Sequence, residues 1–289
     1  MKKCKRVLYL VMMVLSSLLI ATGADDPSLT FKFKTINIPG SHGANVAGIN
    51  NAGAMVGWWY TDQNGDTHGL LLSKGKLTNI DEPNGTNTLC FAINKHGAIV
   101  GWYTSSGGLP QGFLYKGGKF SDIGPVGAKF SYAFGINDKG EISGTYVDSN
   151  SAKHGFLWNG ITYATLDVPT ATRTIAFGIN NGGMVTLEWG DSAGNLESSL
   201  YDGKKYAKIN VPGATNSDAH AINNLGDIAY SWTDSSGVFR GALRHGGKYY
   251  KFTDPKGVDS FADGLNDHRV IVGGYDTSSG VSKGFRATY

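Results

Sequence analysis

The organisation of the chain is decided by a stretch that reads Ala133-Phe134-Gly135-Ile136-Asn137-Asp138-Lys139-Gly140. Its aliphatic-asparagine pair recurs six times: Ile49-Asn50, Ile93-Asn94, Ile136-Asn137, Ile179-Asn180, Ile222-Asn223 and Leu265-Asn266. Successive asparagines are 44, 43, 43, 43 and 43 residues apart. A period of this length that is rich in turn residues predicts stacked supersecondary units.

Each repeat divides into four short predicted strands. The first usually ends at a proline, which cannot donate to a β-ladder. The second ends at the asparagine pair, and an Asn-x-x-Gly turn follows in five repeats; the sixth has Arg269 in place of glycine. Asparagine first and glycine fourth fit a type I turn that closes into a glycine bulge. The third strand carries one aromatic residue in every repeat, which we expect to pack between neighbouring blades: Trp59, Tyr103, Tyr146, Trp189, Trp232 and Tyr275.

Four antiparallel strands repeated six times predict an all-β fold, a six-bladed β-propeller. The last repeat lacks a proline-ended strand of its own, and the segment from Phe33 to Pro39 can supply it. Closure of this kind pairs the two ends of the chain and removes open sheet edges. The strand that ends at the asparagine should be innermost, because glycine or alanine lies two positions before every asparagine. A β-solenoid is the structural alternative, although its coils are usually shorter.

The N-terminal 24 residues have the order of a secretory signal peptide. Four basic residues up to Arg6 precede an apolar run from Val7 to about Ile20, and small residues lead to Ala24. The apolar run is short for a membrane span, and an uncleaved anchor is the alternative. Residues 25–30 then form a short linker, and residues 31–289 form a single six-repeat domain. The protein is expected to be secreted or periplasmic, with no stable membrane span after cleavage.

Removal of this segment changes the charge balance of the chain. It carries four of the 26 basic residues and none of the 23 acidic ones, so 22 basic and 23 acidic residues remain. Near-neutral charge without a basic patch argues against a nucleic-acid partner. Cys90 is the one cysteine after residue 24, and alanine or valine holds its position in the other repeats. Cys90 is therefore predicted to serve packing.

The repeats also resemble the HAF-type extracellular repeat family. The resemblance rests on the Gly-Ile-Asn-x-x-Gly-x-Ile-x-Gly stretch, clearest at residues 135–144, and on the run His154-Gly155-Phe156-Leu157-Trp158. Glycine stands where the family has the alanine of His-Ala-Phe, and the motif is degraded to Glu197-Ser198-Ser199 in a later repeat. The resemblance implies a secreted repeat protein without an assigned biochemical role. It supplies no catalytic residues.

No catalytic residue, cofactor or metal site is predicted. His68 and His154 share one repeat position, but they lie two repeats apart and so are poorly placed to share zinc. The segment Asp62–Asp66 resembles a calcium loop, whereas Asx-turn chemistry explains the equivalent aspartates without a metal. The chain has no His-Glu-x-x-His motif, phosphate-binding glycine loop or nucleophile elbow.

The candidate ligand-binding residues lie where the repeats stop agreeing. Inner-strand and loop positions that are mostly apolar or neutral in early repeats become charged in later ones, at Arg173, Asp218, His220, Asp259 and Asp263. We predict that these five side chains line one polar pocket at the channel mouth and orient a polar ligand through charge-assisted hydrogen bonds. Solvated loops, or an ion-pair network that satisfies itself, would give the same pattern.

These features favour a secreted, non-catalytic module that is monomeric and binds an extracellular glycan, peptide or protein. The alternative is a carbohydrate-active hydrolase or lyase with Asp218 and Asp259 as an acid/base pair and His220 assisting. Such enzymes need two carboxyl groups about 5–10 Å apart, a separation that a sequence does not give. A structural surface protein that merely presents loops is the third hypothesis.

Overall fold

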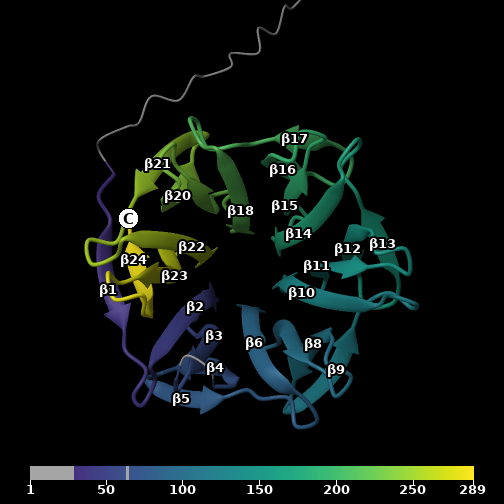
Figure 1. Cartoon of the computed structure of the whole chain (residues 1–289), viewed down its shortest axis with the longest axis horizontal. Helices are drawn as coiled ribbons and strands as arrows, with labels where there is room; N and C mark the ends of the chain where they lie inside the picture. The colour runs from purple at the N-terminus through teal and green to yellow at the C-terminus, as the bar shows by residue number, and fades with distance from the viewer. Residues whose placement is uncertain (1–28, 63–64) are drawn as a thin grey trace, which may run out of the picture.

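The computed structural model describes residues 29–62 and 65–289, so the predicted signal peptide lies outside the described residues. The described chain forms six four-stranded antiparallel sheets arranged around a central axis (Figure 1). This confirms the predicted six-bladed propeller. None of the described residues forms a helix that is long and apolar enough to cross a membrane.

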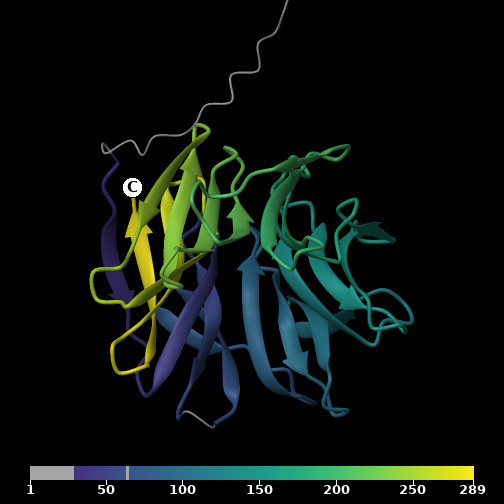
Figure 2. The same ribbon diagram turned by 45° about the horizontal axis from the view of Figure 1, so that its top comes forward.

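In each blade the four strands follow one another from the axis to the rim. The tilted view in Figure 2 shows the strands of each blade side by side. Blade 1 holds β2 (Gly43–Ile49), β3 (Met55–Tyr60), β4 (Thr67–Ser73) and β5 (Lys76–Asn79). Blade 2 holds β6 (Thr86–Ile93), β7 (Ile99–Thr104), β8 (Pro110–Lys116) and β9 (Lys119–Ile123). Blade 3 holds β10 (Phe130–Ile136), β11 (Ile142–Val147), β12 (Lys153–Trp158) and β13 (Tyr163–Leu166).

The remaining blades follow the same order. Blade 4 holds β14 (Arg173–Ile179), β15 (Val185–Gly190), β16 (Leu196–Tyr201) and β17 (Tyr206–Lys208). Blade 5 holds β18 (Asn216–Ile222), β19 (Ile228–Thr233), β20 (Phe239–His245) and β21 (Lys248–Phe252). Blade 6 holds β22 (Asp259–Leu265), β23 (Val270–Asp276), β24 (Ser282–Thr288) and β1 (Lys32–Ile36).

The first and last strands of the chain close the ring in blade 6. Strand β1 pairs antiparallel with β24, from Lys32 opposite Thr288 to Ile36 opposite Gly284. Phe33 packs against Phe285, with ring centroids 5.3 Å apart, and Phe31 lies 4.6 Å from Phe252 in blade 5. The predicted closure by the N-terminal strand is therefore confirmed.

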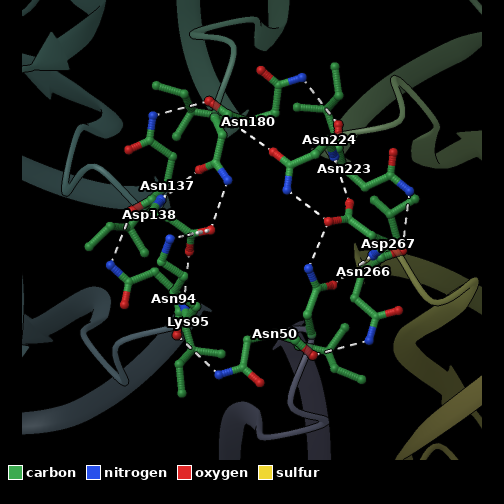
Figure 3. A pocket seen from close by; sticks show the side chains of 18 residues that line it. Asn50, Asn94, Lys95, Asn137, Asp138, Asn180, Asn223, Asn224, Asn266 and Asp267 are labelled. Carbon is green, nitrogen blue, oxygen red and sulfur yellow. Dashed lines mark hydrogen bonds and ion pairs between the residues drawn. The ribbon is translucent and has the colours of Figure 1, made fainter.

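The six repeated asparagines form a closed ring of hydrogen bonds around the axis (Figure 3). Each side-chain amide donates to the backbone carbonyl of the asparagine in the next blade, over 3.0 Å from Asn50 to Asn94 and 3.1 Å at the other five links. Each side-chain oxygen accepts from the backbone of its own turn, as Asn180 does from Gly182 and Met184. One residue type thus closes the turn and joins adjacent blades.

The predicted turn after each asparagine has the expected geometry. In five repeats the glycine N–H donates to the asparagine carbonyl and the glycine has a positive φ, such as 85° at Gly140. Arg269 takes the same left-handed conformation in the sixth repeat, with a φ of 58°. Glycine accommodates this conformation without steric cost, which explains its recurrence.

A second, incomplete ring lies beside the first. In five of the six repeats, the residue after the asparagine donates its backbone N–H to the side-chain oxygen of the equivalent residue in the next blade. Five such bonds connect Lys95, Asp138, Asn181, Asn224, Asp267 and Asn51. The sixth bond cannot form because the Lys95 side chain has no acceptor atom.

The hydrophobic core is divided into clusters that lie between neighbouring blades. Val100 of blade 2, for example, packs in one cluster with Ile142 and Phe156 of blade 3. The inner strands approach closely: a Cβ atom on Gly178 would lie 2.8 Å from the Cα of Ala221 in the next blade. Small residues are therefore required near the axis, as the sequence predicts.

The third-strand aromatic residues pack between neighbouring blades, as predicted: Tyr103 of blade 2 shares a cluster with Val56 of blade 1, and Tyr275 of blade 6 shares one with Leu243 of blade 5. Their polar contacts, in contrast, lie within a blade. Tyr103 donates from its hydroxyl to Asp122 over 3.0 Å, and the indole N–H of Trp232 donates to the Gly241 carbonyl. Tyr275 lies 3.1 Å from the hydroxyl of Thr35. Each of these polar groups thus reaches another strand of its own blade.

We predict that Asn180→Ala destabilises the protein by about 2–4 kcal/mol, because it removes one inter-blade bond and leaves buried backbone groups of the turn without an acceptor. Urea unfolding measures this change. Asn150→Ala, in an exposed loop, is the control and should stay within about 0.5 kcal/mol of the unmodified protein. Equal effects of the two substitutions would show that the asparagine ring does not stabilise the propeller.

We also predict that a protein starting at residue 37 melts far below one starting at residue 29. The shorter protein loses the β1 ladder, the burial of Ile36 and the partial burial of Phe31 and Phe33, each side chain contributing at most roughly 1.5–3 kcal/mol. The sum approaches the whole stability of a typical domain. Thermal melts followed by circular dichroism test the difference, and coincident curves would refute closure by β1.

Candidate functional site

The end of the channel opposite the asparagine ring carries side chains that differ from blade to blade. Every inner strand has a register shift three residues before its asparagine. The residues at this bulge are Ala47, Phe91, Phe134, Phe177, His220 and Asp263. Bulges redirect a side chain out of the regular alternation. All but Phe177 line an axial cavity of about 90 Å³.

Blades 1 to 4 give this ring an aromatic half. Trp58 packs against Phe91 with ring centroids 5.3 Å apart, and Phe91 packs edge-on against Phe134 at 5.1 Å. Phe134 lies 5.0 Å from Phe177, which in turn lies 4.8 Å from the imidazole of His220. The aromatic wall therefore passes directly into the polar half.

The polar half is a chain of contacts across blades 4, 5, 6 and 1. The Arg173 guanidinium lies 2.6 Å from a Glu188 carboxylate oxygen. His220 Nδ1 lies 3.0 Å from one carboxylate oxygen of Asp263, and the other oxygen accepts a 2.9 Å hydrogen bond from Asn45. Asp263 is thereby held between blades 5 and 1.

Glu188 and Asp218 form a carboxyl pair within this chain. Oδ1 of Asp218 is buried and has no hydrogen-bond donor among the described residues, while its carboxyl group lies within hydrogen-bonding reach of Glu188. Burial, and then the charge of Asp218, raise the pKa of Glu188 to about 7. Burial likewise raises the pKa of Asp218. The charge of Asp218 therefore favours the protonated form of Glu188.

His220 carries the compensating positive charge. Its burial opposes protonation, but the hydrogen bond and charge of Asp263, together with the carboxylates of Asp218 and Glu188, raise the pKa of His220 above its ordinary value. In mildly acidic solution Glu188 is therefore protonated, and the positive charge of His220 balances that of a neighbouring carboxylate.

A pocket of about 290 Å³ opens beside Asp263, between blades 6 and 1, and we call it the rim pocket. Its lining residues are Asn45, Trp58, Tyr60, Phe261, Asp263, Gly274, Tyr275, Asp276 and Ser282. Gly274 occupies the position held by Trp58, Trp102, Thr145, Glu188 and Ser231 in the other blades. A Cβ atom at Gly274 would lie 2.6 Å from Asn45 Oδ1, so a side chain there would displace Asn45.

The structure brings four of the five predicted site residues together. Arg173, Asp218, His220 and Asp263 belong to the polar chain, although only His220 and Asp263 line the cavities described here. Asp259 does not join them: it accepts a 2.8 Å hydrogen bond from the backbone N–H of Phe239. Asn87 and Asn216 do the same for Thr67 and Leu196. Asp259 is thus a blade-joining residue, because its repeat position faces the preceding blade.

Glu188 is the site residue that the inner-strand comparison missed. It lies on β15, opposite Ile175 in the β14–β15 register, and it interacts with Asp218 across the blade boundary. The signal was present in the sequence, because its repeat position varies among tryptophan, threonine, glutamate, serine and glycine. Only the strand register shows that this position faces the channel mouth.

The other candidate residues have structural surroundings. His68 lies 3.1 Å from Asp81, and His154 lies 2.7 Å from Asp167, so each histidine pairs with an aspartate of its own blade. Among the described residues, no group of three or more His, Cys, Asp or Glu side chains could hold a metal ion. Cys90 is fully buried, as its repeat position predicts, and burial raises the pKa of its thiol.

The loop aspartates act through Asx turns where the structure describes them. Asp148 accepts hydrogen bonds from the backbone N–H groups of Asn150 and Ala152, each over 2.9 Å. These bonds, first of all the one from Ala152, lower the pKa of Asp148. The segment Asp62–Asp66 includes residues 63 and 64, which lie outside the described residues. The expectation of an Asx turn rather than a calcium site at Asp62–Asp66 stays a prediction.

We predict that the stability of the protein falls as pH rises from about 4.5 through about 7. Glu188 keeps a proton in the folded state that it loses near its ordinary pKa of 4.5 when unfolded, so unfolding releases protons in this window. His220, whose folded pKa is also raised, adds the same slope above its ordinary pKa of 6.5.

Urea midpoints between pH 4.5 and 8 test this prediction. Glu188→Gln removes one titrating group and should reduce the slope below pH 7, leaving the contributions of Asp218 and His220. A midpoint that rises over this range, or an equal slope in the variant, would contradict the assignment of the raised pKa to Glu188.

Comparison with known proteins identifies the fold and no family. No family model matches the chain, and no curated protein matches it. Among solved structures, a lectin of Aleuria aurantia with a six-bladed propeller fold is similar at 13% identity and a TM-score of 0.54, covering 88% of this chain and 93% of the lectin. SapL1 lectin in complex with alpha methyl fucoside is similar at 12% identity and a TM-score of 0.55, covering 83% and 90%. TolB of Acinetobacter baumannii is similar at 14% identity and a TM-score of 0.55, covering 87% of this chain and 65% of TolB.

Proposed function

We propose that the chain is a carbohydrate-binding module that takes its ligand in the rim pocket between blades 6 and 1. The observation that carries this proposal is the composition of that pocket, in which Trp58, Tyr60 and Phe261 share one space with Asp263 and Asn45. A sugar ring has apolar C–H faces that pack on aromatic rings and hydroxyl groups that donate to carboxylates. A concave apolar site with a few fixed polar groups matches both requirements.

The hydrogen bonds around Asp263 support a binding role. His220 and Asn45 fix the carboxylate from both sides, so its orientation does not depend on the ligand. Each carboxylate oxygen has a further lone pair that can accept from a hydroxyl group. Fixed acceptors reduce the entropy that binding costs.

The similar lectins support the same class of ligand. Solved complexes of Aleuria aurantia lectin and of SapL1 lectin contain alpha-methyl fucoside. The identity of 12–14% means that their binding residues do not carry over to this chain. The signal-like residues 1–24 support export, which would place the module where extracellular glycans occur.

The hydrolase alternative is less well supported by the geometry. Asp218 pairs with Glu188, and two carboxyl groups within hydrogen-bonding reach leave no room for a glycosidic bond between them. Asp259, the other residue of the expected acid/base pair, is bonded to the Phe239 backbone. We therefore propose binding without turnover, which an assay on the bound glycan for released sugars would check.

We predict that Trp58→Leu and Asp263→Asn each weaken glycan binding at least about tenfold, which corresponds to 1.4 kcal/mol. A glycan array of the chain from residue 25 selects the ligand, and calorimetry measures its affinity. Asp259→Asn is the matched control, because asparagine already fills this position at Asn87 and Asn216. Absence of binding across the array, or equal affinities in all variants, would refute the proposed site.

A further inference from the structure

The largest cavity described in the structure lies at the opposite end of the propeller. It is a groove of about 520 Å³ between blades 2 and 3, beside the asparagine ring. Blade 2 contributes Ala98, Leu114 and Lys116, and blade 3 contributes Lys139 and Trp158. The groove shares Asn94, Ile136 and Asp138 with the lining of the channel, but it shares no residue with the rim pocket.

The groove is open because one small residue occupies a position that other blades fill. The residue four after each repeated asparagine is Ala54, Ala98, Glu141, Met184, Asp227 or Val270. Glu141 bonds to the amide of Asn137 at 2.6 Å, and Met184 packs against a core cluster. Asp227 contacts His245 and Tyr289.

The first blade boundary also has alanine at this position, and the aromatic pair beside it is closer than the pair at the groove. Tyr115 packs there with the Ala54 cluster and lies 4.9 Å from the ring of Phe120. The corresponding residue at the groove is Trp158, whose ring is 6.3 Å from Tyr163. Trp158 Nε1 has no hydrogen-bond acceptor in the part of the chain that the structure describes.

The charged side chains around the groove are mainly basic. Lys116 and Lys139 are exposed and come from the two blades that form the groove, and His96 belongs to the same lining. Asp138 is the one carboxylate among the described lining residues, and it is already engaged. It accepts from the Lys95 backbone and from Asn181, and it lies 3.9 Å from the Lys95 ammonium group.

We infer that this groove is a second ligand site, which binds an acidic saccharide: a sugar ring against Trp158 and Leu114, with its carboxylate held by Lys116 and Lys139. An apolar floor with an indole suits the ring, and two ammonium groups suit the anionic substituent. This inference rests on the proposed carbohydrate binding for its ligand class, but on a separate set of residues for its site.

Tetragalacturonate is the probe, and its methyl ester is the matched ligand, because esterification removes the charge and keeps the rings. Calorimetry should show binding of the acid that weakens with added salt, and at least tenfold weaker binding of the ester. Trp158 emission should shift on binding. The double substitution Lys116→Ala and Lys139→Ala should weaken binding at least tenfold, whereas Lys76→Ala and Lys34→Ala, at exposed lysines of outer strands in blades 1 and 6, should leave it unchanged.

Ala98→Met is the most direct variant, because the chain itself uses methionine at this position in Met184. Filling the groove should abolish tetragalacturonate binding without lowering the melting temperature. Binding that survives Ala98→Met in a folded protein would overturn the inference.

The experiments distinguish failure of the groove site from failure of the rim pocket. Trp58→Leu and Asp263→Asn should leave tetragalacturonate binding unchanged, and its loss in these variants would assign the acid to the rim pocket and overturn the groove site. Failure of tetragalacturonate to bind would also overturn the groove site, while array binding that is sensitive to Trp58→Leu would leave the rim pocket standing.

Discussion

The propeller depends on the hydrogen bond from each repeated asparagine to the next blade. The amide of Asn50 and its five equivalents reach the neighbouring carbonyl, while the same side chain closes its own turn. Each bond is buried, so an unmade one would leave polar groups without water. Since every link requires the next blade at the same distance, one residue type fixes the spacing of all six blades.

This constraint holds one end of the channel and leaves the other end free to vary. At the asparagine end, aliphatic residues such as Ile136 close the axis and glycine or alanine permits close packing. At the far end, the bulge turns one side chain per blade toward the axis without a packing requirement common to all blades. An aromatic wall and a polar chain can therefore occupy opposite halves of one ring.

The two candidate binding sites arise from missing side chains rather than from added ones. Gly274 leaves the rim pocket beside Asp263, and Ala98 leaves the groove beside Trp158. In a repeat protein the neighbouring blades show what normally fills such a space, such as Glu188 or Met184. The polar chain behind the rim pocket carries a cost, because burial raises the pKa of Glu188. Arg173 and His220 offset part of this cost by placing positive charge nearby.

The sequence by itself determined the blade count, the four-stranded blades, the asparagine turns and the closing strand, because every blade repeats the same local packing problem and a period reports it directly. It also selected Arg173, Asp218, His220 and Asp263, which lie in one chain of polar side chains, while a ligand-binding role for them stays a prediction. Only the tertiary structure separated Asp259 from them and added Glu188, because strand register and blade neighbours decide which side chains meet. The packing of the third-strand aromatic residues between blades also followed from the repeat, whereas their hydrogen bonds within a blade required the structure. The groove at Ala98 was invisible for a different reason: a cavity depends on what several distant segments fail to fill.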